Sequence, residues 1–259
     1  MCIRDSYIEM HIYDIYDTSG TYLGQDTVYE GDVYYSRSNN GGASFSSYYA
    51  IANNDIDIII MHFNYDEGGA DVAVDDANNV AVAYYSQADE GHLISIGLLI
   101  IYIILTGGLP PFWFDYTWYT ICYRGSHNGG GSFESEVEIV NDWFVDRWNP
   151  GIDVYGSGTS AELHCSYSEA GFLSLAEASA SFKKVDDPFY SPSVGSEVYV
   201  ADGYTYAGNL ECDSDGNPHI AITDDFSWTD YDIYYTRSTD GGASFLDPIA
   251  VDIGAYDSY

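Results

Sequence analysis

DIYYTRSTDGGASF, residues 232–245, is the stretch of sequence that decides the fold. A near copy, DVYYSRSNNGGASF, occupies residues 32–45, and a looser copy, TICYRGSHNGGGSF, occupies residues 120–133. Each copy joins a run rich in tyrosine or β-branched residues, which favours a strand, to a glycine-rich stretch, which favours a turn. A segment that recurs in this way indicates a repeat architecture.

The polar residues of this motif are suited to closing a tight turn. An Asp or Asn side chain folds back onto nearby backbone N–H groups, glycine supplies positive φ where the chain reverses, and the final aromatic residue packs to close the hairpin. Two of the three copies carry Asn, so the turn needs no charge, which disfavours metal binding or acid catalysis there. We assign this structural role to Ser38, Asn40, Gly42, Phe45, Ser126, Asn128, Gly130, Phe133, Ser238, Asp240, Gly242 and Phe245.

A second pattern recurs upstream of the motif. Residues 209–225 read as a strand, a turn and an alternating strand, and residues 71–86 and, more loosely, 152–168 repeat this order. Residues 9–17 look like the second strand of such a pair. A complete unit is then strand, tight turn, strand, variable loop, strand, motif turn and strand. Four antiparallel strands in a repeated unit predict an all-β fold, a β-propeller.

The spacing of the copies bears on the number of blades. A blade takes about 40–50 residues, so the gaps between Ser38, Ser126 and Ser238 each allow two blade steps. We expect about five visible blades, as part of a six-bladed propeller. The region 87–116 is too short for a further blade and is interpreted as a compressed blade, an inserted hairpin or a sequence error. Its apolar run, residues 94–105, is predicted to form buried strands rather than a membrane span.

The start of the chain is interpreted as non-native. MCIRDS, residues 1–6, looks like a translated sequencing adapter, and Cys2 and Arg4 are therefore left out of the functional candidates. Residues 7–259 are then expected to form a single, truncated propeller domain. No signal peptide is visible in the sequence.

The charge and the cysteines exclude several classes of function. The net charge is −34, from 41 acidic and 7 basic residues, which disfavours binding to nucleic acid and insertion into an anionic membrane. Cys122, Cys165 and Cys212 form no C-x-x-C pair, which disfavours a zinc site. Buried free thiols are expected at these positions, with one disulfide as the alternative.

The motif resembles the Asp-box, or bacterial neuraminidase repeat, of sialidase-like propellers, whose pattern is Ser-x-Asp-x-Gly-x-Ser/Thr-aromatic. The resemblance covers most of residues 7–253. In that family the box is a structural turn away from the active site. Sialidases hold the substrate carboxylate with three arginines, use a Tyr activated by a Glu as nucleophile, and use an Asp as acid/base.

The arginines of this chain depart from that pattern. Arg37, Arg124 and Arg237 each precede a copy of the motif at what we take to be the same repeat position, so repeat symmetry is expected to place them on separate blades. Arg147 is the remaining candidate, and no Arg-Ile-Pro segment is present. The sequence therefore disfavours sialidase activity in this chain.

The same symmetry argument applies to two other groups. His11 and His219 are expected at matching strand positions rather than as a metal pair. Residues 213–217, DSDGN, resemble an acidic calcium loop but fit a strand-to-strand turn, so no cofactor is expected and calcium remains the weaker alternative.

A ligand site is expected on the face opposite the motif turns. The variable loops predicted there are residues 14–31, 110–118, 141–151 and 224–231, which alternate aromatic residues with carboxylates. Aromatic rings stack on sugar faces and carboxylates bind hydroxyl groups, although each Trp can equally fill a gap between blades. The ligand-binding candidates are Trp113, Trp118, Trp143, Arg147, Trp148 and Trp228, and the weaker catalytic candidates are Asp142, Asp146 and Asp225.

The sequence thus predicts an extracellular or cell-surface module that binds glycans or surface proteins. The alternative is a sialidase-like exo-glycosidase with part of its active site outside this stretch of sequence. A structural part of a larger envelope protein is a third possibility.

Overall fold

The structure is a computed structural model of the chain. It describes residues 2–16, 22–52, 56–58, 61–63, 68–87, 101, 104–105, 118–142, 145–171, 178–201, 205–225 and 231–252. The chain forms two compact units, unit 1 (Met1–Gly68) and unit 2 (Gly69–Tyr259), and we describe each by itself. Nearly every element is a β-strand in an antiparallel sheet, so the expected all-β fold is confirmed.

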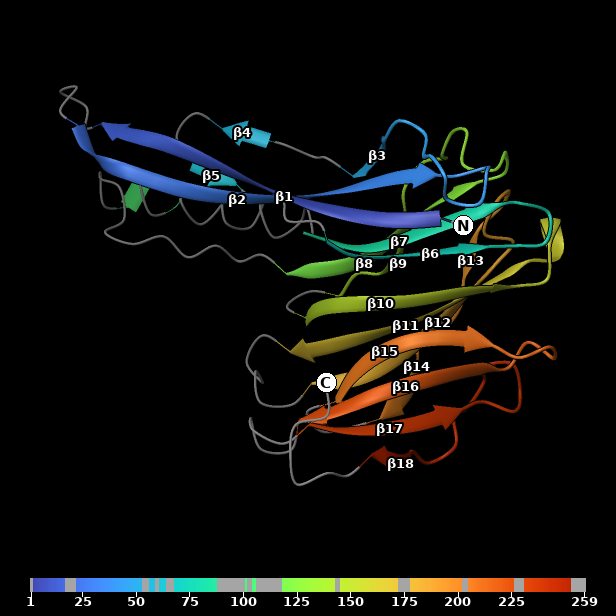
Figure 1. Cartoon of the computed structure of the whole chain (residues 1–259). Helices are drawn as coiled ribbons and strands as arrows, with labels where there is room; N and C mark the ends of the chain where they lie inside the picture. Colours follow the sequence, from blue (N-terminus) through green and yellow to red (C-terminus); the bar gives the residue numbers. More distant parts are fainter. Residues whose placement is uncertain are drawn as a thin grey trace. The chain divides into compact units, whose positions relative to one another are not determined.

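Unit 1 contains a three-stranded sheet and a short hairpin (Figure 1). The sheet has the order β1-β2-β3, with strands β1 (Cys2–Tyr16), β2 (Tyr22–Arg37) and β3 (Tyr49–Ala52), and the hairpin pairs β4 (Ile56–Ile58) with β5 (Met61–Phe63). The expectation of a variable loop at residues 14–31 is wrong, because residues 14–16 and 22–31 lie in the long β1–β2 hairpin. Residues 2–6 pair with residues 33–37 in the same hairpin.

Unit 2 contains three larger sheets. The first sheet has the order β6 (Gly68–Val74), β7 (Val80–Gln87), β8 (Tyr119–Ser126), β9 (Val137–Val140). The second sheet contains β10 (Val145–Tyr155), β11 (Glu162–Gly171), β12 (Ser179–Asp186) and β13 (Ser193–Val194) in order, with β14 (Val198–Ala201) also paired to β12. The third sheet has the order β15 (Thr205–Cys212), β16 (Pro218–Asp225), β17 (Tyr231–Arg237), β18 (Ile249–Asp252). The hairpins expected at residues 71–86, 152–168 and 209–225 are confirmed.

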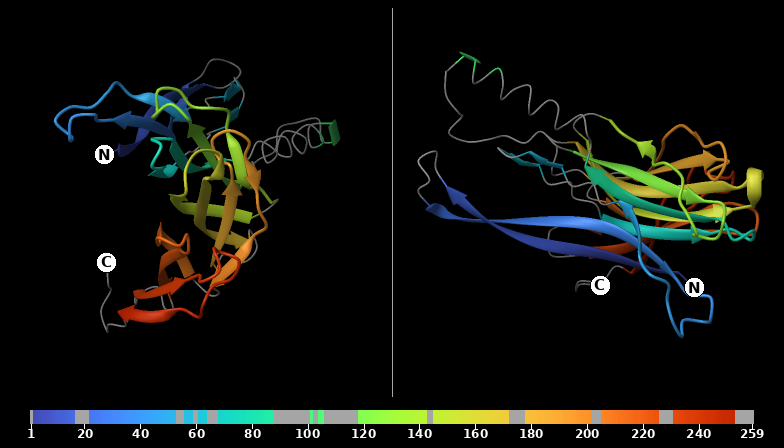
Figure 2. Two further views of the ribbon diagram at one scale, coloured as in Figure 1. Left: turned by 90° about the vertical axis from the view of Figure 1, so that its right-hand side faces the viewer. Right: turned by 90° about the horizontal axis from the view of Figure 1, so that it is seen from above.

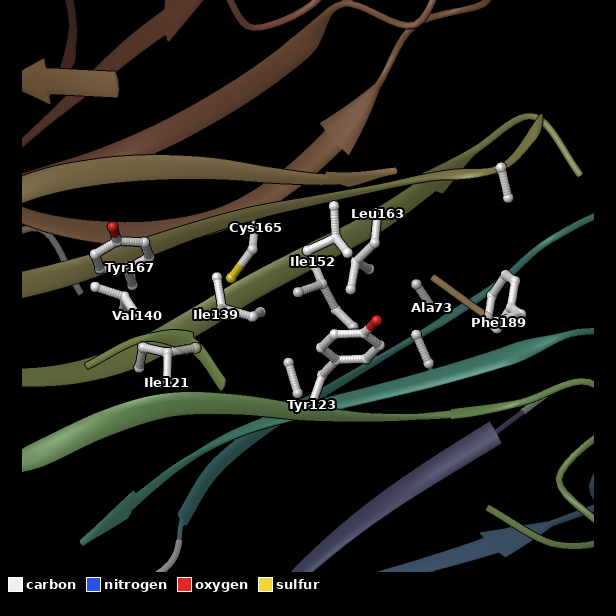
Figure 3. Close-up of a cluster of buried hydrophobic side chains, with 14 residues drawn as sticks. Ala73, Ile121, Tyr123, Ile139, Val140, Ile152, Leu163, Cys165, Tyr167 and Phe189 are labelled. Carbon is white, nitrogen blue, oxygen red and sulfur yellow. The ribbon is translucent and has the colours of Figure 1, made fainter. Parts of the chain in front are cut away.

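The second sheet packs between the other two, with β10 in contact with β7, β8 and β15. Strand side chains alternate between faces, so every second residue enters one of two apolar layers. The layer between the first and second sheets includes Ile121, Tyr123, Ile139, Leu163, Cys165 and Tyr167 (Figure 3). The layer between the second and third sheets includes Phe182, Leu210, Ile220 and Ile222.

Two aspartates tie neighbouring sheets together by the same hydrogen bond. Asp71 Oδ2 of the first sheet accepts the N–H of Ile152 in the second at 3.0 Å. Asp153 Oδ2 of the second sheet accepts the N–H of Cys212 in the third at 2.8 Å. Each carboxylate therefore satisfies a backbone donor on the next sheet, and the stacking of the sheets follows a repeat.

The cysteines of unit 2 are free thiols. Cys122 and Cys165 are buried and Cys212 is half-buried. Burial raises the pKa of the Cys165 thiol well above its usual range, so the group stays protonated and packs as a small apolar side chain. The expectation of buried free thiols is confirmed for Cys122 and Cys165.

The described strands on either side of residues 88–117 belong to one sheet. Strand β7 pairs directly with β8, so the hairpin before residue 87 and the motif copy that begins at Ser126 belong to the same sheet. The region 87–116 is thus the connection between two neighbouring strands. Most of residues 94–105 lie outside the described residues, but Ile101, Ile104 and Leu105 are helical and exposed, so buried strands are wrong at these positions. Among the described residues, no helix is long and apolar enough to cross a membrane.

The strand register changes two of the expected repeat equivalences. Aligning the motif copies on Ser126 and Ser238 places Gly125, not Arg124, at the position of Arg237. Across the adjacent strand, His219 pairs with Arg237 and Cys2 pairs with Arg37, so His11 does not occupy the position of His219. A shift of one residue along a strand reverses the face on which a side chain lies, so Arg124 lies on the face of its sheet opposite to the one that corresponds to Arg237.

A histidine without a hydrogen bond lies in the layer between the second and third sheets. The side chain of His164 is fully buried, and its ring lies 5.6 Å from that of Phe182. Its Nε2 is 3.4 Å from Glu162 Oε2, an ion-pair distance, but neither ring nitrogen makes a hydrogen bond within the described part of the chain. Lys184 and Asp153 also act on this ring, and burial lowers its pKa.

We expect His164 to make unit 2 less stable in mild acid. Because the folded-state pKa is lowered, stability falls as the pH drops below about 6.5, where the unfolded chain binds the proton, and the fall ends below the folded-state pKa. The slope for one proton is at most about 1.4 kcal/mol per pH unit. His164→Leu is expected to flatten this dependence and to stabilise the protein at pH 6, measured by urea unfolding between pH 7 and 5. A variant with the same pH dependence as the parent protein would contradict this expectation.

Candidate functional site

The three copies of the motif form turns closed by their own side chains. In the third copy, Ser238 Oγ donates to Asp240 Oδ1 at 2.7 Å and accepts the N–H of Gly242 at 2.8 Å, while Asp240 Oδ1 accepts the N–H of Ser244 at 2.9 Å. The Asn copies make the same three bonds from Ser38 and Ser126 at 2.8–3.0 Å. Gly42, Gly130 and Gly242 have positive φ. Phe133 is buried and Phe245 packs edge-on against Phe182, whereas Phe45 is exposed.

One difference between the copies is the direction of a hydrogen bond to the Asp or Asn side chain. Ser244 Oγ donates to Asp240 Oδ2 at 2.6 Å, whereas Ser44 and Ser132 accept from the Asn amides at 2.8 Å. The hydroxyl reverses its role, so Asp and Asn both complete the turn. The bond from the Ser244 hydroxyl, followed by that from Ser238, lowers the pKa of Asp240 to about 2.

We therefore expect Asp240→Asn to fold with near-parental stability at pH 7 and Asp240→Ala to be clearly less stable. A lowered carboxyl pKa adds stability above the usual value of about 3.9, and this stability is lost as the pH falls toward about 2. Asp240→Asn is thus also expected to lose less stability between pH 4 and 2. Urea unfolding of both variants at several pH values measures these effects, and equal losses for Asn and Ala at pH 7 would contradict a neutral turn role.

The two ends of the sheets in unit 2 differ in their connections. Tight turns gather at one end, the turn end, which lies to the right in Figure 1 and faces the viewer in the left panel of Figure 2. This end contains the turns at 75–79, 127–136, 156–161, 187–192, 213–217 and 238–248. The other end, the connection end, contains the starts of β8, β10 and β12 and the ends of β9 and β11. Of the residues expected to form the site, Asp142, Asp146, Arg147 and Trp148 lie at the connection end.

Arg147 lies at the connection end in an ion-pair cluster. Its side chain is only 2% exposed, its Nη2 is 2.5 Å from Asp142 Oδ2, and its Nε is 3.3 Å from Glu169 Oε2. Ser181 Oγ in turn donates to Glu169 Oε1 at 2.7 Å. The guanidinium therefore joins the β9–β10 link to β10 and β11, and it is already occupied by two carboxylates. Glu169 was missed by sequence reasoning, because its strand shows only an ordinary alternating pattern.

The aromatic candidates divide into core residues and residues that are not described. Trp118 is 1% exposed and donates through Nε1 to Asn141 Oδ1 at 3.2 Å, so it fills the sheet interior and is not available to a ligand. Trp148 is half-buried at the connection end, where it pairs with Ser168. Trp113, Trp143 and Trp228 lie outside the described residues.

The carboxylate candidates have different surroundings. Asp142 is 65% exposed beside Arg147. Asp146 is half-buried and accepts the N–H of Tyr119 at 3.3 Å, and burial raises its pKa. A raised carboxyl pKa is typical of a general acid but also occurs in structural ion-pair networks. The side chain of Asp225, at the end of β16, lies outside the described residues.

Two tyrosines each donate a hydrogen bond to a glutamate, which is the pairing expected of a Tyr nucleophile activated by a Glu. Tyr84 OH donates to Glu136 Oε2 at 2.5 Å, and Tyr167 OH donates to Glu197 Oε2 at 2.6 Å. The two pairs are repeats, because each joins the second strand of its sheet to the segment before the outer strand. Burial, together with the glutamate, raises the pKa of both phenols far above the usual range. An activated phenol needs the opposite shift, so these pairs hold the sheets together.

An acidic hollow of about 650 Å³ lies at the turn end. It is lined by Asp75, Asp76, Asp153 and Asp213 together with Tyr155, Ser160 and Cys212. Asp213 Oδ1 accepts the N–H groups of Asp215 and Asn217 at 2.9 Å, so its carboxylate closes the turn at 213–217. His219 contacts Tyr235 OH through Nδ1 at 2.6 Å. No metal-binding group of three His, Cys, Asp or Glu side chains occurs in the part of the chain that the structure describes.

Comparison with known proteins identifies the fold alone. No family model and no curated protein matches the chain. Among solved structures, the chain is similar to a protein titled Hadza microbial sialidase Hz136, with a TM-score of 0.54 and 14% identity over 83% of this chain and 40% of that one. It is also similar to a protein of unknown function from Dyadobacter fermentans, with a TM-score of 0.55 and 13% identity over 85% of this chain and 58% of that one. The chain thus spans about half the length of these structures, and its fold is sialidase-like.

Proposed function

We propose that the chain is a single-domain part of a sialidase-like Asp-box β-propeller that binds glycans or proteins at its connection end, on a secreted or cell-surface protein. The likeness to a sialidase fold, the stacked antiparallel sheets and the repeated motif turns support the architecture. The separation of tight turns from longer connections supports the position of the site.

One observation favours binding over sialidase chemistry. Arg147, near the start of β10 at the connection end, is buried and held by Asp142 and Glu169. A guanidinium in this state cannot clamp a substrate carboxylate without losing both ion pairs. The net charge of −34 also repels acidic sugars. The preferred ligands are therefore neutral or basic glycans, or basic protein surfaces, rather than sialylated chains.

A glycan array and a pull-down with the full chain test this proposal. We expect neutral glycans to bind better than sialylated ones, and Trp148→Ala and Asp142→Asn to weaken the binding. Leu246→Ala is the control, because Leu246 is 49% exposed in the turn at 238–248, at the turn end of the sheets. Folded protein that binds no glycan and captures no protein would refute the proposal, as would equal losses in all three variants.

A second candidate function is glycoside hydrolysis. It is favoured by Asp146, which is half-buried near the start of β10 and whose pKa is raised by burial, because inverting and retaining glycosidases both use a carboxylic acid with a raised pKa. A panel of chromogenic glycosides tests it. Turnover that is lost in Asp146→Asn, in a protein with parental stability, would favour this candidate over a binding module.

A further inference from the structure

A smaller pocket opens at the turn end, between the motif turn of the first sheet and the turn that follows β12. It has a volume of about 350 Å³ and is lined by Gly125, His127, Glu134, Ser135, Val137, Pro188, Phe189, Tyr190 and Pro192. This volume falls within the range of about 300–1,000 Å³ that is usual for small-ligand pockets. The first of these turns follows the repeated motif, and residues 187–192 form the second.

The apolar wall of this pocket is held in place by packing and hydrogen bonds. Phe189 is 2% exposed, and Tyr123 OH donates to the carbonyl of Pro188 at 3.1 Å. A Cβ atom on Gly125 would lie 2.9 Å from the same carbonyl, so the two turns approach as closely as glycine allows. The backbone N–H groups of Tyr190 and Ser191 close the second turn onto the carbonyl of Asp187. The pocket is therefore formed before any ligand arrives.

The rim of the pocket carries an aromatic platform and a carboxylate. Tyr190 is 52% exposed, and its ring stacks on that of His127, with centroids 5.6 Å apart and planes inclined by 28°. His127 Nδ1 also lies 3.2 Å from Glu134 Oε1, and the Glu134 side chain is 56% exposed. The His127 imidazole thus holds both the Tyr190 ring and the Glu134 carboxylate in place. Both side chains remain about half exposed and can meet a ligand.

The charge around this pocket selects the sign of the ligand. The chain carries a net charge of −34, Glu134 lines the pocket, and Asp187 precedes the lining residue Pro188 in the chain. Asp187 Oδ1 is buried and makes no hydrogen bond within the described residues. An acidic environment with an aromatic face attracts cations and disfavours anions.

From these features we infer that the pocket binds an arginine side chain from a basic segment of a partner protein. The apolar wall of Phe189, Pro188 and Val137 receives the methylene stem. The planar guanidinium stacks on Tyr190 and donates to the Glu134 carboxylate. Lysine fits less well, because its compact ammonium neither stacks as a plane nor donates in a fork. The site is at the opposite end of the sheets from the proposed glycan or protein site and does not depend on it.

An NMR titration of the full chain with blocked tripeptides tests this inference. The probes are acetyl-Gly-Arg-Gly-amide and its counterparts with lysine and with citrulline, which keeps the shape of arginine without its charge. We expect the arginine peptide to shift the backbone amides of His127, Glu134 and Tyr190, the lysine peptide to bind several-fold more weakly, and the citrulline peptide to bind at least about tenfold more weakly.

Matched variants separate this site from general attraction to an acidic protein. Glu134→Gln is expected to weaken arginine binding about tenfold or more, and Tyr190→Ala about two- to fivefold. Asp247→Asn removes an exposed charge elsewhere, and Tyr199→Ala removes a ring of equal exposure, so both are expected to change the affinity less than twofold. Equal weakening by Glu134→Gln and Asp247→Asn, equal binding of citrulline and arginine, or no shift at these amides would overturn the inference. The comparison of peptides on the unaltered chain decides the question even where a variant folds poorly.

Discussion

Arg147→Met is expected to destabilise unit 2 by about 3 kcal/mol. Removing one member of a buried ion pair usually costs about 3–5 kcal/mol, because the partner is left as an uncompensated buried charge. Glu169 is in that position, since its side chain is only 15% exposed, whereas Asp142 is 65% exposed and regains water. The effect is therefore expected at the lower end of the range. Urea unfolding of the full chain, followed through the transition of unit 2, measures it.

Two further variants show whether the loss of stability comes from the broken ion pair or from the loss of the arginine side chain's apolar stem. Arg147→Met combined with Glu169→Gln removes both charges, and we expect the double variant to be more stable than the sum of the two single changes predicts. Arg237→Met, at an exposed arginine beside a motif turn, is expected to change the stability by less than about 0.5 kcal/mol. A loss of glycan binding in Arg147→Lys without any loss of stability would instead place Arg147 in contact with the ligand.

The elements that the sequence predicted well are those with a marked turn. Residues 209–225 combine an Asp-x-Asp-Gly-Asn turn with alternating apolar residues on both sides, so both the turn and the two strands follow from local chemistry. The structure has β15, the turn at 213–217 and β16 in this order. Local patterns of this kind are readable because the side chains that define them act within a few residues.

The mistakes arose where a pattern does not determine register or partner. Residues 14–31 contain glycine, serine and aspartate as well as tyrosine and valine. The glycine and polar residues suggested a loop, although residues 14–16 and 22–31 pair across a long hairpin. His11 and His219 both lie in alternating strands, but alternation alone does not say how far a strand has slid along its neighbour. The insertion after β7 likewise hid the fact that β7 and β8 are neighbours.

The sequence predicted where some of the candidate residues lie but not what surrounds them. The order of the strands places Arg147, Trp148 and Asp146 at the connection end. The Arg147–Glu169 ion pair and the burial of Trp118 both depend on packing between segments that lie more than 20 residues apart in the chain. Such contacts carry no local signal, which is also why the Tyr84–Glu136 pair was not foreseen.

Two glycines in turns of the third sheet also determine how the sheets stack. Gly216 and Gly242 both lie against an aromatic ring of the second sheet: an added Cβ would be 2.7 Å from Tyr155 and 2.5 Å from Phe182. Phe182 is 1% exposed and is fixed between the rings of His164 and Phe245. The third motif copy thus closes its own hairpin and also fits against the neighbouring sheet.

Gly242→Ala is consequently expected to be far more destabilising than Gly241→Ala. Both glycines have positive φ, +88° and +69°, so alanine costs about 1–2 kcal/mol of backbone strain at either position. At Gly241 an added Cβ meets nothing within 4 Å, whereas at Gly242 it collides with the Phe182 ring, and overpacking adds about 1–3 kcal/mol. We expect a total of about 2–5 kcal/mol for Gly242→Ala, measured by urea unfolding beside Gly241→Ala.

A second change at the contacting ring tests the cause. Phe182→Leu removes the ring atoms that an added Cβ at position 242 would meet. If this collision is responsible, Phe182→Leu should lower the free energy of unfolding less in the Gly242→Ala protein than in the parent protein. The coupling would show that packing against the second sheet, and not only the geometry of the hairpin itself, requires glycine at position 242. Equal losses for Gly241→Ala and Gly242→Ala, with no coupling to Phe182, would mean that backbone strain alone sets the requirement for glycine.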